Sequence, residues 1–563
     1  MTGSDYIIQI LKKYDVTDVF GIPGAVVLDL IYAFDRNGIK PHLCYHEQAA
    51  GFAACGYAQA KNSLGVAYAT KGPGVTNMIT AIADAYYDSV PVLFITAHSM
   101  TAGSSQIRFM ENQEMNVVSM VSHIVKYAEY VETETELLSK VENACAIAME
   151  NRKGPVLLDF SSKLLEQAIT QNAEQIIQKN TLSKTIAKQA IEIMVQSINA
   201  SSNPVILIGN GIKQSKHPEI LEQFCSNNKI PILSSRTALD CFAYSDAYFG
   251  YVGSRGLRYA NFILSKCDLI VSIGNRMAYA PKSKSFQDVM SDKQVLRLEI
   301  DENEFERHIP NSIDIKCDLA DVIEGLKHVK VQYSNPQCWI QTCVKLRKEL
   351  YDYDMNNPVR KMAGILQLLP QNITIVSDVG NNALWLSRTH NYLKLKNRVL
   401  FSMGLSCLGN ALCKSIGVFF AERQFAICII GDQGLQMNIQ ELEFISSNKI
   451  PIFIILINNH SSGMIKNWEN QKYGYDLHSS PENGYGVPDF QKITYAYGIN
   501  YVSFSGQESV LKALDYCVNG TPVLLDVLIN PSDKVLPSLQ RGVPCCQMTP
   551  ELPPELYEVL SQL

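Results

Sequence analysis

The sequence predicts an α/β protein made of three doubly wound domains, each a parallel sheet covered on both faces by helices. The chain has 563 residues, and at roughly 150 residues per domain this length suits three or four domains. Short continuous runs of Val and Ile recur along it, each ended by Gly, Asn or Asp and followed by a segment of helical length. Such runs are typical of strands buried on both faces of a parallel sheet.

The apolar runs mark predicted strands in three groups along the chain. In the first group, strands at residues 64–70 and 91–97 are joined by the segment KGPGVTN and then a helical run to about Tyr87, which makes one β-α-β unit. The second group predicts strands at residues 204–211, 268–275 and 295–301. The third group predicts strands at residues 373–380, 425–432, 451–459 and 522–529, with an amphipathic helix over about 435–448.

Polar segments without a periodic pattern separate these groups, at about residues 167–184 and 332–357. We therefore expect an N-terminal domain over residues 1–166, a central domain over residues 185–331 and a C-terminal domain over residues 358–530. Residues 531–563 form a Pro-rich extension. This extension should run extended over the surface and end in one short helix, because proline interrupts both helices and sheets.

The overall charge and the cysteines narrow the class of protein. The 49 basic and 55 acidic residues give a net charge of −6, which argues against a nucleic-acid partner and favours small molecules. The 15 cysteines form no CxxC pair and no zinc-site spacing, as expected for free thiols in a reducing cytoplasm. The charged N-terminus lacks the apolar core of a signal peptide, and no uncharged apolar run approaches about 18 residues, so we expect a cytoplasmic protein without a membrane span.

The carboxyl ends of two predicted strands carry the residues best suited to a ligand site. Asp432 ends one strand, and Asn459 ends the next strand after the intervening helix. A β-α-β crossover makes the two strands parallel, so both side chains should lie at the sheet edge where α/β proteins bind ligands. A carboxylate, an amide oxygen and backbone carbonyls suit Mg²⁺, which would neutralise a diphosphate. Each residue alone could instead be a helix cap or part of a turn.

The segment GDQG, followed by NN 27 residues after its Asp, resembles the thiamine-diphosphate and magnesium motif of thiamine-dependent enzymes. The resemblance assigns metal binding to Asp432, Asn459 and the backbone carbonyl of Ser461. A second segment, HEQAAGFAACGYA, resembles the stretch whose glutamate contacts the aminopyrimidine ring, and it gives that catalytic role to Glu47. A carboxylic acid bonded to a ring nitrogen can promote removal of a cofactor proton. The alternative is an ordinary exposed glutamate on a helix.

Further segments extend the resemblance over nearly the whole chain and point to the acetolactate synthase branch. They are FGIPGAVVLDL, KGPGVTN, SMGLSCLGNALCKSIG and GMIKNW. In that family the cofactor lies between the first domain of one subunit and the third domain of its partner, which implies a homodimer or a homotetramer. Leu408 matches the residue that props the cofactor into its bent shape. The cofactor-binding residues implied are Gly24, Ala25, Gly72, Asn77, Gly380, Asn381, Asn382, Leu408, Gly431, Asp432, Gln433, Gly434, Asn459, Ser461, Gly463 and Met464.

The same resemblance suggests a substrate pocket. Met464 and Trp468 match positions that line the acceptor pocket in acetolactate synthases, although a tryptophan could equally be a core residue. Gln113 resembles the polar residue on the donor side, and His98 stands where a synthase has Gln. No two of the 10 histidines are adjacent, whereas simple pyruvate decarboxylases use an adjacent pair to protonate the two-carbon intermediate. The sequence therefore favours carbon–carbon bond formation over aldehyde release.

The sequence of the central domain is compatible with a bound flavin but does not require one. The segment GNGIKQ at residues 209–214 has the first two glycines of a dinucleotide-binding turn and Gln at the third position. The segment GNRMAYAP at residues 274–281 resembles part of the flavin segment of acetolactate synthases, which hold FAD in this domain. FAD is therefore possible here, and a purely structural domain is the alternative.

The resemblance implies a thiamine-diphosphate-dependent enzyme that decarboxylates pyruvate and transfers the two-carbon unit to an acceptor carbonyl. With pyruvate as acceptor the product would be 2-acetolactate. The C-terminal extension is more similar to synthase relatives whose acceptor is a nucleotide-linked keto sugar, and Arg541 is its candidate phosphate ligand. The extension could equally pack on the surface. A 2-keto acid oxidase or decarboxylase, and a regulatory protein that has lost turnover, are further alternatives.

Overall fold

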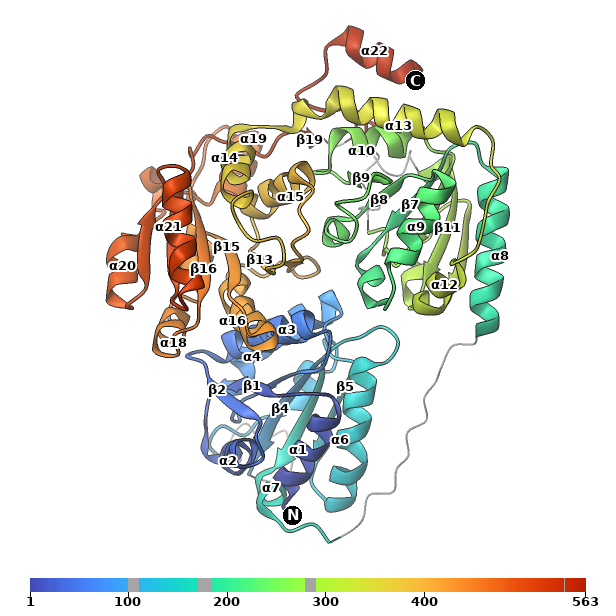
Figure 1. The fold of residues 1–563 in the computed structure, drawn as a ribbon. Helices are drawn as coiled ribbons and strands as arrows, with labels where there is room; N and C mark the ends of the chain where they lie inside the picture. The colour runs from blue at the N-terminus through green and yellow to red at the C-terminus, as the bar shows by residue number, and fades with distance from the viewer. Residues whose placement is uncertain (100–110, 171–183, 279–289, 541) are drawn as a thin grey trace. The chain divides into compact units, whose positions relative to one another are not determined.

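The computed structural model of the chain describes residues 1–99, 111–170, 184–278, 290–540 and 542–563. Within them, three six-stranded sheets are built from parallel strand pairs and flanked by helices (Figure 1). The predicted class of three doubly wound α/β domains is confirmed. All 15 cysteines are free thiols, and most are buried, as expected. Among the described residues no helix is both long and apolar enough to cross a membrane.

The first sheet has the strand order β2-β1-β3-β4-β6-β5. Its strands are β1 (Asp18–Gly21), β2 (Lys40–Leu43), β3 (Gly65–Tyr68), β4 (Val92–His98), β5 (Tyr127–Val131) and β6 (Val156–Ser161). Its helices are α1 (Gly3–Lys13), α2 (Leu28–Arg36), α3 (Glu47–Lys61), α4 (Pro73–Asp88), α5 (Val117–Val121), α6 (Glu134–Met149) and α7 (Ser162–Glu166). Every residue of β3 and β4 is buried, which explains their continuous apolar sequences.

The central sheet has the order β12-β11-β10-β7-β8-β9. Its strands are β7 (Pro204–Ile208), β8 (Ile232–Ser234), β9 (Tyr248–Tyr251), β10 (Leu269–Ile273), β11 (Gln294–Glu299) and β12 (Ser312–Lys316). Helices of this part of the chain include α8 (Lys184–Ala200), α9 (Glu219–Asn228), α10 (Arg258–Lys266), α12 (Leu319–Gly325), α13 (Pro336–Leu350) and α14 (Asn357–Leu366).

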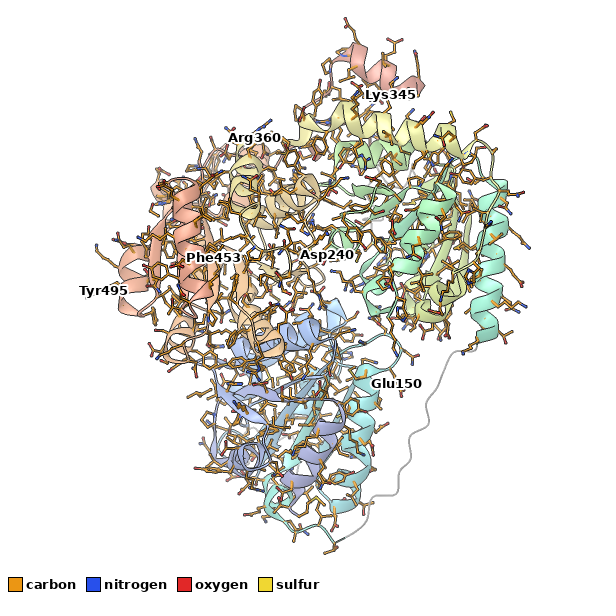
Figure 2. The ribbon with its side chains drawn as sticks, in the orientation of Figure 1. Glu150, Asp240, Lys345, Arg360, Phe453 and Tyr495 are labelled. Carbon is orange, nitrogen blue, oxygen red and sulfur yellow. The ribbon has the colours of Figure 1, made fainter. Side chains whose placement is uncertain are left out.

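The third sheet has the order β14-β13-β15-β16-β18-β17. Its strands are β13 (Ile375–Ser377), β14 (Val399–Phe401), β15 (Ala426–Gly431), β16 (Ile452–Asn458), β17 (Asn500–Ser503) and β18 (Val523–Leu528). Its helices are α15 (Asn381–Leu393), α16 (Asn410–Glu422), α17 (Asp432–Met437), α18 (Glu441–Ser447), α19 (Gly463–Tyr473), α20 (Phe490–Ala496) and α21 (Gln507–Val518). Figure 2 labels Phe453 of β16, which is fully buried, and Tyr495 of α20, which points outward.

The single helix predicted over about 435–448 is wrong, because the segment forms two helices, α17 and α18. Asn438 ends α17 with a non-helical backbone. Its side-chain amide donates to the carbonyl oxygen of Gly409 at 3.0 Å instead of pointing to solvent. A short polar side chain that bonds outside its own helix competes with helix formation, which explains the interruption.

The tail is more buried than the sequence suggested. After residue 531 it forms a small antiparallel sheet of β19 (Ser538–Leu539) and β20 (Met548–Thr549), and then the helix α22 (Pro554–Gln562). Two fully buried arginines donate to its backbone carbonyls. Arg258 reaches Met548 and Pro550, and Arg388 reaches Leu536 and Pro537. The expected short helix at the end of the chain is confirmed, and the extended segment before it is anchored because these guanidinium groups satisfy its backbone carbonyls.

The chain divides into two compact units. Unit 1 comprises Met1–Lys179, Ile373–Ala383 and Val399–Pro531, and it holds the first and third sheets. Unit 2 comprises Asn180–Asn372, Leu384–Arg398 and Ser532–Leu563, and it holds the central sheet and the tail. The strands of the three sheets lie within residues 18–161, 204–316 and 375–528, and the domain limits proposed from the sequence remain predictions.

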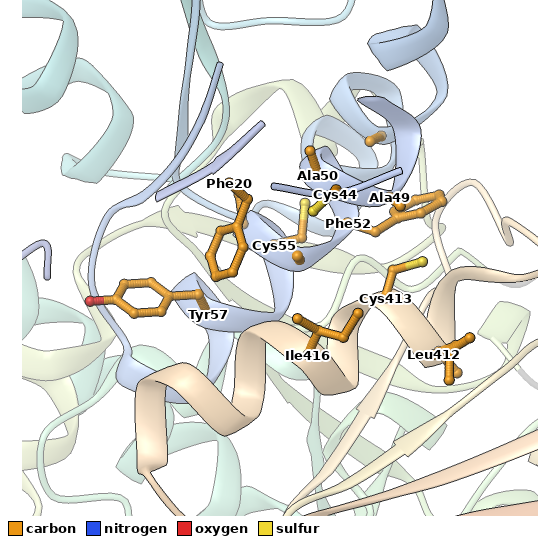
Figure 3. Close-up of a cluster of buried hydrophobic side chains, with 14 of the residues drawn as sticks. Phe20, Cys44, Ala49, Ala50, Phe52, Cys55, Tyr57, Leu412, Cys413 and Ile416 are labelled. Atoms are coloured by element: carbon orange, nitrogen blue, oxygen red, sulfur yellow. The ribbon is translucent and has the colours of Figure 1, made fainter. Parts of the chain in front are cut away.

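Helices α3 and α16 form the main contact inside unit 1, and both are lined by small residues. A Cβ atom at Gly56 would overlap the backbone of Lys414, and one at Gly417 would overlap the carbonyl oxygen of Ala53. Figure 3 shows Cys55 of α3 and Ile416 of α16 in the shared apolar cluster. The two glycines therefore allow the helix backbones to approach closely, which joins the first and third sheets in one core.

We predict that Gly417→Ala destabilises unit 1. The added methyl group would overlap the backbone of α3, and overpacking of this kind costs about 1–3 kcal/mol. The midpoint of thermal unfolding should therefore fall. Gly364→Ala is the matched control, since Gly364 lies in α14 and a Cβ atom there meets nothing within 4 Å. The control should keep or raise the midpoint. A Gly417→Ala protein as stable as the wild type would contradict the close crossing.

Candidate active site

The edge of the third sheet where β15 and β16 end gathers the first group of polar residues. The two strands are parallel neighbours, with Gly431 opposite Ile457 in the register. Asp432 follows β15 as the first residue of α17, and Asn459 follows β16 directly. Asp432, Asn459 and Ser461 are all buried. The crossover thus places the polar ends of both strands at one edge.

Asp432 is held by three donors. Its Oδ2 accepts the N–H of Ser461 at 3.2 Å, and its Oδ1 accepts the hydroxyl of Tyr485 at 2.9 Å and the N–H of Gln433 at 2.8 Å. Burial raises the pKa of Asp432, although these hydrogen bonds act in the opposite direction. A buried carboxylate of this kind is favoured in its charged form by a cation bound next to it.

Two amide side chains meet beside Gly463. A Cβ atom at Gly463 would lie 2.5 Å from Nδ2 of Asn459 and 3.1 Å from Nδ2 of Asn381, so only glycine leaves both amides in place. Nδ2 of Asn381 and Oγ of Ser461 are buried and have no hydrogen-bond partner among the described residues. Buried polar atoms without partners are rare. They fit a bound group that supplies acceptor oxygens, such as a diphosphate.

The oxygens available here could hold a metal ion. Asp432 offers a carboxylate, Asn459 an amide oxygen and Ser461 a backbone carbonyl, which is a donor set that hard divalent cations accept. The described residues contain no cluster of three His, Cys, Asp or Glu side chains able to bind a metal. A single carboxylate supplemented by neutral oxygens is the arrangement expected where a phosphate group completes the coordination.

Gly380, Asn382 and Gly434 line the same edge, next to β13. The backbone of Gly380 has φ +127°, which a residue with a side chain rarely adopts. Nδ2 of Asn382 donates to the carbonyl oxygen of Asp378 at 2.8 Å. A Cβ atom at Gly434 would overlap the carboxylate of Asp378.

The sequence reasoning missed Asp378, a fully buried carboxylate beneath this edge. It accepts the N–H of Gly409 at 3.0 Å, the N–H of Asn410 at 3.2 Å and the side-chain amide of Asn410 at 2.9 Å. Burial raises its pKa to about 7, against the effect of these hydrogen bonds. Asp378 therefore fixes the backbone that directly follows Leu408, a residue that is itself half-buried. Asp378 follows β13 at the same sheet edge as Asp432, so the sequence could have identified it as a candidate site residue.

Tyr485 was also missed, and the sequence carries no signal for it. It lies 53 residues after Asp432, in a segment between α19 and α20. Burial raises the pKa of its hydroxyl, and the charge of Asp432 raises it further. The phenol therefore remains a proton donor to the carboxylate.

The first domain contributes Glu47, which is nearly buried as the first residue of α3. Its Oε2 accepts the side-chain amide of Asn77 at 3.0 Å, and a Cβ atom at Gly74 would lie 3.6 Å from its Oε1. Asn77 and Gly74 belong to α4, which begins just after β3. Gly24 lies against Thr70, since a Cβ atom there would overlap its side chain. The loops after β1 and β3 thus meet beside α4, with Ala25 in the turn that follows Gly24.

Gln113 lies directly beside Gly72. A Cβ atom at Gly72 would lie 2.8 Å from Cβ of Gln113. Gln113 has the left-handed backbone angle φ +66° and an exposed side chain. The next residue, Glu114, accepts the ammonium of Lys71 at 2.8 Å and the N–H of Ser99 at 2.9 Å. These bonds hold Gln113 next to the start of α4.

His98 belongs to an ionic cluster at the end of β4. Its Nδ1 lies 3.0 Å from Oδ2 of Asp159, and its Nε2 lies 3.7 Å from Oε1 of Glu132. Burial alone would lower the pKa of His98, but its hydrogen bond to Asp159 and the charges of Asp159, Glu114 and Glu132 raise it overall. His98 is therefore stabilised as a cation by carboxylates of its own domain.

Met464 and Trp468 lie on α19, a helix without a fully buried residue. Met464 is half-buried, and the side chain of Trp468 is 49% exposed. The alternative of a core tryptophan is therefore wrong. The described contacts do not join these two residues to His98 or to Gln113.

The glycines of the central domain pack against protein. A Cβ atom at Gly209 would overlap the carbonyl oxygen of Gly274, and one at Gly211 would lie 2.8 Å from Cα of Gly274. Close approach of the turns after β7 and β10 therefore explains these glycines without a nucleotide. Residues 279–281 of the possible flavin segment, residues 104–110 before Gln113, and Arg541 lie outside the described residues.

Three family models match successive parts of the chain. Residues 1–120 match the N-terminal TPP binding domain of thiamine pyrophosphate enzymes, residues 191–326 match the central domain, and residues 378–527 match the C-terminal TPP binding domain. The Asp432 edge lies in the C-terminal match, and the Glu47 pocket lies in the N-terminal match.

Curated relatives cover nearly the full chain. The acetolactate synthase large subunit of Pyropia yezoensis is 30% identical over 570 residues, covering 97% of this chain and 95% of the relative. The large subunit from Lactococcus lactis is 29% identical, covering 96% and 95%. The isozyme 2 large subunit of Escherichia coli is 28% identical, covering 98% and 100%. With both cofactor-binding domains present and similarity along its whole length, the chain belongs to the thiamine pyrophosphate enzymes, in the branch of acetolactate synthase large subunits.

Proposed function

We propose that this protein is a carboligase that decarboxylates pyruvate with thiamine diphosphate and Mg²⁺ and transfers the two-carbon unit to an acceptor carbonyl. The observation that carries the proposal is the β15–β16 edge. There Asp432 is buried, and the side-chain amides of Asn459 and Asn381 flank Gly463, with Nδ2 of Asn381 lacking a hydrogen-bond partner among the described residues. The family membership supplies the ligand class, and 2-acetolactate is the product proposed with pyruvate as acceptor.

The residues at this edge divide into two roles in the proposal. Asp432, Asn459 and the carbonyl of Ser461 hold Mg²⁺, since these oxygens suit a hard cation. The remaining group would bind the diphosphate and the thiazolium, and Leu408 would support the cofactor. That group comprises Gly380, Asn381, Asn382, Gly431, Gln433, Gly434, Gly463 and Met464. Tyr485 and Ser461 orient Asp432 through its two oxygens.

Glu47 is the proposed catalytic acid, in a pocket with Gly24, Ala25, Gly72 and Asn77. Bound thiamine diphosphate would supply a cationic ring that accepts the electron pair released as CO₂ leaves. Glu47 would hold its proton toward the aminopyrimidine ring from Oε1, because Oε2 already accepts Asn77. Burial of Glu47 excludes water and strengthens this hydrogen bond.

The proposed substrate pocket comprises His98, Gln113, Met464 and Trp468. Gln113 is the best supported of them, since it lies against Gly72 beside the Glu47 pocket. His98 is proposed here from its position in the family resemblance, and its imidazole is already bonded to Asp159. The exposed face of Trp468 would contact the acceptor. FAD in the central domain remains a prediction, and a cytoplasmic location agrees with 15 free thiols.

The first test is to incubate the protein with thiamine diphosphate, Mg²⁺ and pyruvate, and to identify the products by mass spectrometry. We expect CO₂ release together with 2-acetolactate. CO₂ release that requires an added keto-sugar nucleotide would point to that acceptor instead. Acetate formation with reduction of an electron acceptor would point to an oxidase. Absence of CO₂ release under all these conditions would contradict the proposal.

Glu47→Gln should abolish turnover, with a fall of about 10²–10⁴-fold in kcat, while thiamine diphosphate still binds. The amide cannot supply the proton that the proposed acid holds, and general acid–base catalysis has this magnitude. Steady-state CO₂ release and fluorescence titration with the cofactor measure the two effects. Glu508→Gln, an exposed change on α21, is the control. Wild-type turnover in Glu47→Gln would overturn the assignment.

Asp378→Ala should weaken thiamine diphosphate binding by about 10- to 100-fold, because it leaves the buried N–H groups of Gly409 and Asn410 without acceptors. The dissociation constant can be measured by fluorescence titration in the presence of Mg²⁺. Asp515→Ala, an exposed change on α21, should bind as the wild type does. Equal cofactor affinity in the two variants would show that Asp378 does not support the loop at Leu408.

We propose a homo-oligomer in which Glu47 of one subunit faces Asp432 of another. The contacts described between the first and third domains of unit 1 would then join two subunits, and residues 171–183, which lie between these domains in the chain, are outside the described ones. Glu47→Gln and Asp432→Ala subunits should each be inactive alone. Coexpressed, they should recover about one quarter of wild-type activity, since half of randomly paired dimers hold one intact site. No recovery in isolated mixed dimers would place both halves on one chain.

A further inference from the structure

Glu441 brings a buried carboxyl group to the backbone that precedes Glu47. It is the first residue of α18 and is fully buried. Its Oε1 accepts the backbone N–H of Tyr45 at 3.0 Å. Tyr45 and His46 lead directly into α3, whose first residue is Glu47. A residue of the third domain therefore holds the turn that presents the proposed catalytic acid of the first domain.

A second contact holds the other side of Glu47. The side-chain amide of Asn438 donates to Oε1 of Gln48 at 3.3 Å and to the carbonyl oxygen of Gly409 at 3.0 Å. Gly409 follows Leu408, the proposed support of the cofactor. Tyr45 and Gln48, before and after Glu47, are thus bonded to Glu441 and Asn438, which lie at the break between α17 and α18. Asn438 also links them to the loop at Leu408 and Gly409.

Burying the carboxyl group of Glu441 costs free energy of desolvation. Its Oε2 has no hydrogen-bond partner in the part of the chain that the structure describes. Burial raises its pKa to about 7, while hydrogen bonds from the backbone of Tyr45 and His46 and from the side chain of Gln440 lower it. The thiols of Cys44 and Cys413 also face it, and burial raises the pKa of both, so they are neutral. An apolar residue would avoid this cost, which indicates a role other than stability.

We propose that Glu441 is a positioning residue that sets the location of Glu47 by holding the Tyr45–His46 turn against the third domain. This inference rests on the proposed function of Glu47. Displacement of a reacting group by about 1 Å can cost about 100-fold in rate. Because a carboxylate is a stronger acceptor than a carboxylic acid, the turn is held most firmly when Glu441 is ionised, above a pH of about 7.

The experiment follows the step that Glu47 promotes, without any substrate. The wild type and its variants are mixed with thiamine diphosphate and Mg²⁺ in deuterated buffer, and exchange of the cofactor's C2 proton is followed by NMR after acid quench. Cofactor affinity is measured in parallel by fluorescence titration. The variants are Glu441→Leu, which removes the acceptor, and Glu441→Gln, which keeps an acceptor without a charge. The control is Glu443→Gln, a partly exposed change two residues along the same helix.

We expect C2 exchange to slow by about 100-fold in Glu441→Leu, with cofactor affinity within about threefold of the wild type. In the wild type the exchange rate should fall as the pH drops through about 7, where Glu441 takes up a proton. Glu441→Gln should keep most of the exchange rate at pH 8 and lack the part of the pH dependence that comes from Glu441. Glu443→Gln should match the wild type in rate, affinity and pH profile.

Exchange in Glu441→Leu within about twofold of the wild-type rate would overturn the positioning role, and so would a loss that only follows weaker cofactor binding. If Glu441→Leu does not fold, the pH profile of the C2 exchange rate in Glu441→Gln decides the question. A profile identical to that of the wild type would overturn the proposal. A wild-type protein that binds the cofactor but does not accelerate C2 exchange would overturn the proposed function of Glu47 itself. The two failures are therefore distinguishable.

Discussion

The close crossing of α3 and α16 is the constraint on which the arrangement of unit 1 depends. Glycines on both helices remove the side chains that would keep the backbones apart. A fully buried ion pair between Asp84 of α4 and Lys414 of α16 lies at the same contact, at 2.8 Å. Breaking such a pair would leave a charge in an apolar core, so the two domains have little freedom to shift. This rigidity brings the start of α3 to the third sheet.

The third domain buries three carboxyl groups near the candidate site. Asp378 holds the backbone at Gly409, Asp432 is held by Tyr485 and Ser461, and Glu441 holds Tyr45. Burial raises the pKa of all three. Their desolvation is offset by backbone and hydroxyl donors, which fixes both the carboxyl groups and the loops that donate to them.

A chain of hydrogen bonds connects the two halves of the site, the Leu408 loop and the Glu47 turn. The Asp378 carboxylate fixes the loop after Leu408, and Asn438 joins that loop to Gln48. Glu441 then fixes the turn before Glu47. Each link is a hydrogen bond between buried groups, so movement of one segment would expose unpaired donors or acceptors in the others. Catalytic groups that must be placed within fractions of an ångström need support of this kind.

Part of the site could be foreseen from the sequence. Apolar runs located the strands, and the rule that ligands bind at the carboxyl ends of parallel strands selected Asp432 and Asn459. The same rule, applied to β13, would have found Asp378. Tyr485 and Glu441 could not be found this way, because each acts on a segment distant in sequence through packing alone. The break at Asn438 was missed because its cause is a bond to Gly409, outside its own helix.

The three parallel sheets are encoded locally in the sequence, because a strand buried on both faces requires a continuous apolar run. The sequence also determined which polar residues end those strands. The folded chain was needed to show that the third domain holds the turn before Glu47, that Trp468 is exposed, and that buried arginines hold the tail. These depend on long-range hydrogen bonds and close backbone contacts, and such interactions leave no local pattern in the chain.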